Sequence, residues 1–134
     1  MALAAAIERT NVDLHNEMIK KAEDLIPVLR ERSESANVDR RIPKETIQDM
    51  KDAGFFKILQ PKQYGGFELD PHTFSEVPLR ISQGCMSTAW GLGVIGIQPF
   101  QLALYDDKAQ LEVWGEDDNT LVSSSYAPMN QVQW

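Results

Sequence analysis

The 134-residue sequence is long enough for one domain with a sizeable core, and its 43% apolar and 25% charged residues are ordinary for a globular protein. A net charge of −7 argues against nucleic acid or an anionic membrane as a partner. The single cysteine, Cys85, excludes an internal disulfide framework, and no basic stretch precedes the short apolar run at the N-terminus, so we expect a cytoplasmic protein.

The first expected helix covers residues 14–29. Its apolar residues recur at steps of three and four, which is the period of one helix face: Leu14, Met18, Ala22, Leu25, Ile26 and Leu29. Pro27 lies inside this pattern and predicts a kink or a restart of the helix. The pattern is lost over residues 34–41, which predicts a connecting segment there.

Two further helices are marked by the residues at their ends. Pro43 fits a first helical position and Gly54 fits a terminator, so a second helix is expected between them. Asp70 before Pro71 fits a cap followed by a first-turn proline, which opens a third helix. Pro78 is expected to interrupt the third helix or to shift its start.

No charged residue occurs from Ile81 to Tyr105. A run of this length could span a bilayer, but it contains glutamines, Pro99 and four glycines, and no cluster of basic residues flanks it. A helix buried on most sides is therefore the better interpretation. Ser87 is expected to cap a fourth helix that reaches about Ile97, and Pro99 is expected to open a fifth.

The last part of the chain changes character. Asp106 or Asp107 fits the cap of a sixth helix that ends before Gly115. The acidic residues 116–118 are most simply a solvated loop. From residue 120 onward, β-branched and small residues alternate over a short stretch, which indicates a weakly marked strand.

The residues alone predict no catalytic constellation. The sequence GLGVIG (residues 91–96) has the glycine spacing of a dinucleotide fingerprint but lacks the preceding strand, and Pro99 follows closely, so tight packing against another helix explains the glycines better. His15 and His72 stand far apart in the sequence, and neither is a convincing ligand or base. Cys85 is expected to be a small buried residue, and no metal-ligand spacing occurs.

Four segments together carry a family resemblance: RRIPKETIQDMKDAGFFKILQPKQYGG, STAW, LALYDDKAQLEVWGED and SSSYAPM. In order and spacing they resemble the N-terminal third of the flavin-dependent monooxygenases built on the acyl-CoA dehydrogenase fold. The resemblance runs from about Leu25 to Met129. QYGG alone is shared by the whole superfamily, whereas STAW followed by SSSYAP is much more specific.

The resemblance implies a domain organisation. Residues 1–118 are expected to form the all-α N-terminal helical domain of the acyl-CoA dehydrogenase fold, and residues 119–134 to begin the middle β domain with its first strand. The rest of the β domain and the C-terminal helix bundle are expected to be absent, so that the chain is a fragment of about a third of a family member.

The resemblance also implies roles for a few residues. Flavin is expected to lie between the helical and β domains, with Trp90 at the border of its site. Ser124 is assigned the side-chain, catalytic role at the flavin, and Ser123 and Ser125 are assigned backbone contacts, because alternate strand residues point to opposite faces. Taken without the resemblance, the serines are more simply solvent-facing residues of an edge strand, and Trp90 is a core aromatic residue.

One position departs from the family pattern. Phenol hydroxylases of this family have a histidine near the phenol where this chain has Gln98. Glutamine can hydrogen-bond a phenol but cannot accept its proton at neutral pH. Gln98 is expected to bind substrate, and two alternatives stay open: either the substrate is bound differently, or another histidine takes the proton, as the resemblance implies for one in the C-terminal helix bundle.

The implied activity is that of the oxygenase component of a two-component system. A separate reductase supplies reduced FMN or FAD, and oxygen adds at flavin C4a to give a hydroperoxide that hydroxylates a phenolic aromatic or steroid-derived substrate. A homotetramer is implied as well. Two alternatives stay open: an acyl-CoA dehydrogenase-type flavoenzyme, whose strand more typically reads Thr-Glu-Pro, and a non-catalytic helical module that binds a partner through residues 81–105.

Overall fold

The computed structural model describes residues 2–124, with side chains from residue 11 onward, and every regular element in that range is helical. The α-helices are α1 (Ala2–Asp39), α2 (Lys44–Ala53), α3 (Pro71–Ile81), α4 (Met86–Gly96), α5 (Gln98–Leu102) and α6 (Asp107–Trp114), and two short 3-10 helices are η1 (Phe55–Lys57) and η2 (Lys62–Tyr64). The expectation of an all-α fold is confirmed for these residues.

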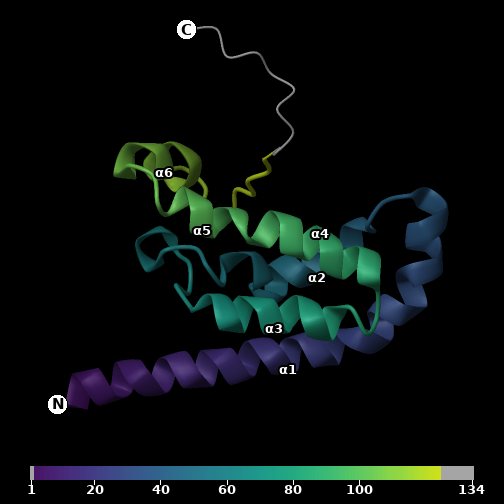
Figure 1. The fold of residues 1–134 in the computed structure, drawn as a ribbon, viewed down its shortest axis with the longest axis horizontal. Helices are drawn as coiled ribbons and strands as arrows, with labels where there is room; N and C mark the ends of the chain where they lie inside the picture. The colour runs from purple at the N-terminus through teal and green to yellow at the C-terminus, as the bar shows by residue number, and fades with distance from the viewer. Residues whose placement is uncertain (1, 125–134) are drawn as a thin grey trace, which may run out of the picture.

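The long helix α1 runs along one side of the molecule, next to α3, and α4 lies against the other side of α3 (Figure 1). The short helices α5 and α6 lie together beyond the C-terminal end of α4. The resulting core is made by α1, α2, α3, α4 and η1. Its fully buried side chains are Met18, Leu29, Met50, Phe55, Ile58, Val77, Ile81 and Leu92.

Several helix ends follow the sequence signals. Asp70 caps α3, and its carboxylate accepts a hydrogen bond of 2.8 Å from the backbone N–H of Thr73. Asp106 caps α6 in the same way through the backbone N–H of Lys108. Gly54 ends α2 with a φ of 84°, a left-handed conformation that glycine adopts without steric cost. These predictions are confirmed.

The predicted end of the first helix is wrong. α1 continues through Pro27 and through the segment expected to be a connection, and it ends only at Asp39. Pro27 is exposed, so the backbone carbonyl that it leaves without a donor can bond to water. Beyond it, the buried side chain of Ala36 keeps the helix packed. The helix ends before Arg40, which has a left-handed backbone with a φ of 51°. Because this residue is not a glycine, the sequence gives no signal for the helix end.

Pro78 does not interrupt α3, which runs from Pro71 to Ile81 without a break. The side chains of Phe74, Val77 and Ile81 are buried along one face of the helix, and this packing outweighs the loss of one backbone hydrogen bond at the proline. Two smaller differences concern helix starts. Pro43 is the cap of α2 rather than its first residue, and α4 begins at Met86 after an extended Cys85 rather than at a Ser87 cap.

The expected strand is not seen in the described part of the chain. Residues 121–124 form no regular structure, and the remainder of that strand, from Ser125 onward, lies outside the described residues. A strand satisfies its backbone groups by pairing with another strand, and none is present in residues 2–124. Among the described helices, none is long and apolar enough to cross a membrane.

Candidate functional site

An open groove of about 670 Å³ lies between α3 and α4. This volume is in the range of small-molecule binding sites. Each helix contributes residues three or four positions apart, so one face of each helix lines the groove. The lining residues are Ser75, Pro78, Leu79 and Ser82 from α3, Met86, Ala89, Trp90, Gly93 and Val94 from α4, then Ile97, Gln98 and Ser124.

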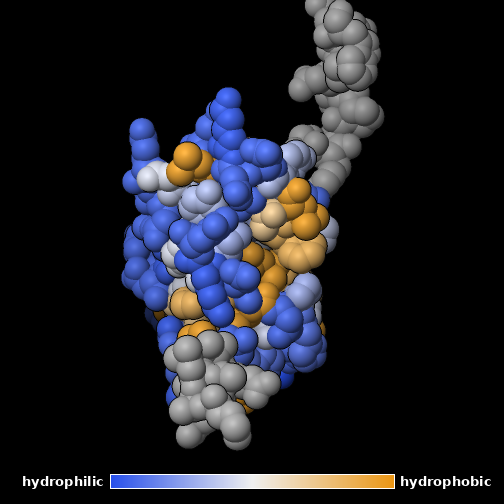
Figure 2. Space-filling model, turned by 90° about the vertical axis from the view of Figure 1, so that its left-hand side faces the viewer, coloured by the Kyte–Doolittle hydropathy of each residue, from blue (hydrophilic) through white to orange (hydrophobic). Residues whose placement is uncertain are grey.

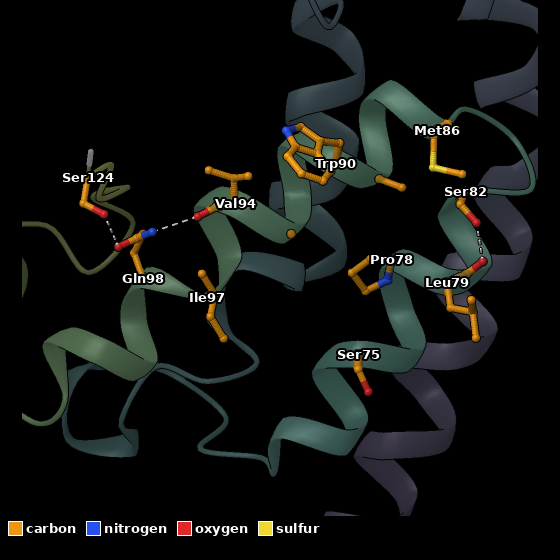
Figure 3. Close-up of a pocket in the computed structure, with 12 residues that line it drawn as sticks. Ser75, Pro78, Leu79, Ser82, Met86, Trp90, Val94, Ile97, Gln98 and Ser124 are labelled. Atoms are coloured by element: carbon orange, nitrogen blue, oxygen red, sulfur yellow. Dashed lines mark hydrogen bonds between the residues drawn. The ribbon is translucent and has the colours of Figure 1, made fainter. Parts of the chain in front are cut away.

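The lining of the groove is mainly apolar, and several of its apolar side chains are exposed. Trp90 is 75% exposed, Met86 69% and Leu79 56%, which is unusual for large hydrophobic residues. All three project from their helices on the groove side (Figure 3). Figure 2 shows a hydrophobic band along one side of a face that is otherwise hydrophilic. The groove is therefore an apolar surface that the described residues leave open.

Two glycines of the GLGVIG segment have different functions in this geometry. A Cβ added at Gly96 lies 2.7 Å from Phe74 Cε2, so Gly96 allows α3 to pack closely against α4. A Cβ added at Gly93 meets nothing within 4 Å, and Gly93 lines the groove. The prediction that the glycines serve helix packing is therefore confirmed at Gly96. At Gly93 the missing side chain instead leaves room next to Trp90 for a bound molecule.

A chain of two hydrogen bonds closes one end of the groove (Figure 3). Ser124 Oγ donates to Gln98 Oε1 at 2.9 Å, and Gln98 Nε2 donates to the backbone oxygen of Val94 at 3.0 Å. Gln98 is only 3% exposed, whereas Ser124 is exposed. The buried amide thus connects the last described residue to the C-terminal end of α4.

The segment that leads to Ser124 is held to the body of the protein at several points. Asp118 forms an ion pair of 3.0 Å with Lys57, and its backbone oxygen accepts a 2.9 Å hydrogen bond from Gln60 Nε2. Trp114 Nε1 donates to the backbone oxygen of Thr120 at 3.4 Å. Because these contacts fix residues 118–120, the chain reaches the groove in a defined direction.

The structure brings together three of the residues that the sequence singled out: Trp90, Gln98 and Ser124 all line the groove. Ser123 is exposed and does not line it, and Ser125 lies outside the described residues. The sequence analysis missed Pro78, Leu79, Met86 and Gly93 as lining residues. Within residues 86–97, a sequence signal for the lining residues of α4 was available. Apolar and small residues recur there at helical spacing on a second face, next to the face of the buried residues Ala89, Leu92 and Gly96.

His15 and His72 are not apart in space, although 56 residues separate them in the sequence. Their rings stack with centroids 5.9 Å apart and an angle of 13° between planes, and His15 Nδ1 lies 2.8 Å from Thr73 Oγ1. The physical reason is the packing of α1 along α3, which no local sequence signal marks. The pair lies outside the groove, and no group of three or more possible metal ligands occurs among the described side chains, residues 11–124.

The acidic residues 116–118 form a mainly exposed loop, as expected, and two of them also make specific contacts. Asp117 accepts a hydrogen bond of 2.9 Å from the backbone N–H of Asn119, which lowers the pKa of Asp117. Asp118 forms the ion pair with Lys57 described above. Glu116 is exposed, as expected. Cys85 is buried, which confirms its expected role as a small buried residue.

Comparison with known proteins identifies the family. Residues 13–114 match the family model described as acyl-CoA dehydrogenase, N-terminal domain. The chain is 46% identical over 107 residues to the flavin-dependent monooxygenase oxygenase subunit HsaA of Mycobacterium tuberculosis, which covers 80% of this chain and 27% of that protein. It is 32% identical to the oxygenase component of p-hydroxyphenylacetate 3-hydroxylase of Acinetobacter baumannii, covering 87% of this chain and 28% of that protein.

The fold agrees with this match. The crystal structure of the HsaA monooxygenase from M. tuberculosis superposes with a TM-score of 0.83 and 43% identity, over 86% of this chain and 32% of that chain. The protein therefore belongs to the acyl-CoA dehydrogenase N-terminal domain family. It spans a little more than a quarter of the length of the curated relatives named above.

Proposed function

We propose that the chain forms the N-terminal part of the oxygenase component of a two-component, reduced-flavin-dependent monooxygenase. In this proposal residues 1–118 are the helical domain and residues 119–134 begin the middle β domain. A complete protein then also contains the rest of the β domain and a C-terminal helix bundle. The complete protein is further proposed to be a cytoplasmic homotetramer that receives its flavin from a separate reductase.

The observation that carries the proposal is the meeting of Trp90, Gln98 and Ser124 in one apolar groove. These residues come from two segments of the chain that the sequence links only through a family resemblance. The exposed face of Trp90 and the open space at Gly93 fit a planar ring system such as flavin or a phenol. The comparisons support the same class of activity, because the relatives named above are oxygenase components of monooxygenases.

The proposed roles follow from the chemistry of each side chain. Reduced FMN or FAD, when bound, supplies the activation of oxygen for transfer to the aromatic ring. Ser124 contacts the flavin or the reacting atoms through its hydroxyl, while Ser123 and Ser125 offer backbone groups and Trp90 borders the ring. The apolar side chains Leu79 and Met86 exclude water from the groove, which limits the wasteful release of hydrogen peroxide.

The proposed substrate is a phenolic aromatic compound, which includes a steroid-derived phenol. Gln98 stands where a base is expected in related phenol hydroxylases, but an amide does not take up a proton at neutral pH. No histidine or carboxylate lines the groove in the described part of the chain, so in this proposal the substrate proton is accepted by a group other than the lining residues or is released to water. One observation favours a second candidate, a helical interaction module: the exposed apolar side chains of α4 suit a protein partner as well as a ligand.

The test is an assay of the complete protein with a flavin reductase, reduced nicotinamide, oxygen and a panel of phenols. We expect a hydroxylated phenol whose formation requires both the reductase and this protein. Reduced flavin titrated anaerobically into the 134-residue chain alone is expected to bind poorly, because the chain provides one wall of the site. Hydroxylation absent for every phenol, together with tight capture of a protein partner by the groove, contradicts the proposal and favours the interaction module.

A further inference from the structure

The orientation of the Gln98 amide is fixed by its surroundings. The backbone oxygen of Val94 can only accept a hydrogen bond, so the amide nitrogen of Gln98 must face it, at 3.0 Å. The amide oxygen then faces Ser124 Oγ, at 2.9 Å. Since Gln98 is 3% exposed, water has little access to its amide group.

This orientation determines the hydrogen-bonding role of Ser124. A serine hydroxyl has one hydrogen and two lone pairs, and the amide oxygen of Gln98 has no hydrogen to give. The Ser124 hydrogen is therefore used within the protein. Only the lone pairs of Ser124 remain for a molecule in the groove, and Ser124 is exposed enough to offer them.

The other two serine hydroxyls of the groove also donate their hydrogen to an acceptor within the protein. Ser75 Oγ donates to the backbone oxygen of His72 at 2.8 Å. Ser82 Oγ donates to the backbone oxygen of Leu79 at 2.8 Å, as Figure 3 shows. The first bond lies within α3, and the second joins Ser82, the C-terminal cap of α3, to the last turn of that helix. All three serines that line the groove thus donate their hydroxyl hydrogen to an acceptor within the protein, which leaves the oxygen lone pairs available to a molecule in the groove.

We propose that Gln98 is a positioning residue that fixes Ser124 as a hydrogen-bond acceptor, so that the groove selects ring compounds that donate a hydrogen bond. A phenol O–H and an N–H of a heterocyclic ring such as reduced flavin have this chemistry, whereas an aryl ether does not. The inference rests on the proposed function in that it takes the groove to be the ligand site. In this inference Gln98 does not contact the substrate itself but orients the hydroxyl group of Ser124, which does.

The test compares phenol with methoxybenzene, which has a similar ring but no O–H. Binding of each probe to the full 134-residue chain is followed by amide shifts in proton–nitrogen NMR spectra, without flavin or oxygen. The extra methyl group favours methoxybenzene in an apolar groove, so a preference for phenol reports a hydrogen bond. We expect phenol to bind about two- to tenfold more tightly than methoxybenzene, the effect of one neutral hydrogen bond.

Two variants separate positioning from a merely structural role. Gln98→Met keeps the length of the side chain but frees the Ser124 hydrogen, so the preference for phenol is expected to fall to about one or to reverse. Gln98→Glu, measured at acidic pH so that its carboxyl group is protonated, donates its O–H to Val94 and retains an oxygen that accepts from Ser124, so it is expected to keep the preference for phenol. Gln83→Met, at an exposed glutamine outside the groove, serves as the matched control and is expected to behave as the wild type.

The outcomes are distinguishable from a failure of the proposed function, because binding is read without turnover. An unchanged phenol preference in a folded Gln98→Met variant overturns the inference, as does tighter binding of methoxybenzene by the wild type. If Gln98→Met does not fold, the inference is tested on the wild type instead, through the hydrogen exchange of its side-chain amide groups in the NMR spectrum. The bond to Val94 predicts that the side-chain amide protons of Gln98 exchange with water more slowly than those of Gln83. Slow exchange together with the phenol preference supports the inference. Equally fast exchange contradicts the bond to Val94 and overturns the inference.

Discussion

Gln60 and Asp118, which are 58 residues apart in the sequence, are joined by a hydrogen bond of 2.9 Å from the Gln60 side-chain nitrogen to the Asp118 backbone oxygen. The same nitrogen also donates to the backbone oxygen of Tyr64. One buried amide therefore fastens both the turn before Gly65 and the segment that leads to Ser124. The position of Ser124 at the groove depends on contacts made well away from it.

Gln60→Met is expected to lower the free energy of unfolding by about 1–3 kcal/mol, because it leaves two backbone oxygens without their donor in a site where Gln60 is 2% exposed. Urea denaturation followed by circular dichroism measures the loss. The backbone amide signals of residues 118–124 are expected to shift as well. Gln63→Met, at an exposed position three residues later, is the control and is expected to change the stability little. Equal stability of the two variants contradicts the role given to Gln60.

Two of the three glycines of α4, Gly93 and Gly96, are expected to respond in opposite directions to substitution by alanine. Gly93→Ala adds a methyl group where nothing lies within 4 Å and improves helix propensity, so it should raise the free energy of unfolding by about 0.5–1 kcal/mol. Gly96→Ala places its methyl group against the Phe74 ring and should lower it by about 1–3 kcal/mol. Thermal denaturation of both variants gives the comparison, and a destabilised Gly93→Ala chain is inconsistent with an open groove at that position.

The Asp70 cap is expected to make the stability depend on pH. The backbone N–H of Thr73, as the main cause, holds the pKa of Asp70 below its ordinary value of 3.8. The pKa is lower in the folded than in the unfolded state, so the stabilisation is present above pH 3.8 and is lost as the pH falls through the folded value. Asp70→Ala should lower the free energy of unfolding by about 1 kcal/mol at neutral pH.

The matched variant for this test is Asp70→Asn. Asparagine caps a helix about as well as aspartate but does not titrate, so this variant should keep most of the neutral-pH stability. Urea titrations at neutral and acidic pH check both points. A gap between wild type and Asp70→Ala that stays constant into acid conflicts with the assignment.

The open apolar groove is expected to cause self-association of the 134-residue chain. Leu79, Met86 and Trp90 are exposed side by side along the groove, and covering such a surface is favourable in water. Leu79→Glu should reduce the association measured by light scattering over a range of concentrations. Val12→Glu, at an exposed valine of α1 away from the groove, is the control and should not. A wild-type chain that stays monomeric at high concentration argues against this prediction.

The sequence predicts the parts of this fold that depend on local chemistry. The cap at Asp70 and the terminator at Gly54 were correct because a side-chain oxygen or a left-handed φ acts on its own helix end. A restart of the first helix at Pro27 and an interruption of the third helix at Pro78 are not seen, because tertiary packing stabilises a helix beyond the cost of one backbone hydrogen bond. The stack of His15 on His72 has no local signal at all.

The candidate site was predictable only in part, for the same physical reason. Trp90, Gln98 and Ser124 were selected through the family resemblance, and their meeting in one groove depends on how α4 and the segment after α6 pack. The sequence does not predict that the Ser124 hydroxyl donates its hydrogen to Gln98. The backbone carbonyl of Val94 sets the orientation of the Gln98 amide, and that orientation makes its oxygen the acceptor for Ser124. The expected strand from residue 120 onward needs a partner strand that residues 2–124 do not contain.

The central claim is that Ser124 acts at the reacting centre of a flavin-dependent monooxygenase. The most direct measurement is the ratio of hydroxylated phenol to hydrogen peroxide formed by the complete protein with its reductase, compared between wild type and Ser124→Ala. Ser123→Ala is the control, because the Ser123 side chain is exposed and does not line the groove. Losing a hydrogen bond to a polarised group costs about 1.5–3 kcal/mol, so the ratio is expected to fall by about ten- to a hundredfold in Ser124→Ala and to change little in Ser123→Ala. An equal ratio in wild type and Ser124→Ala contradicts the claim.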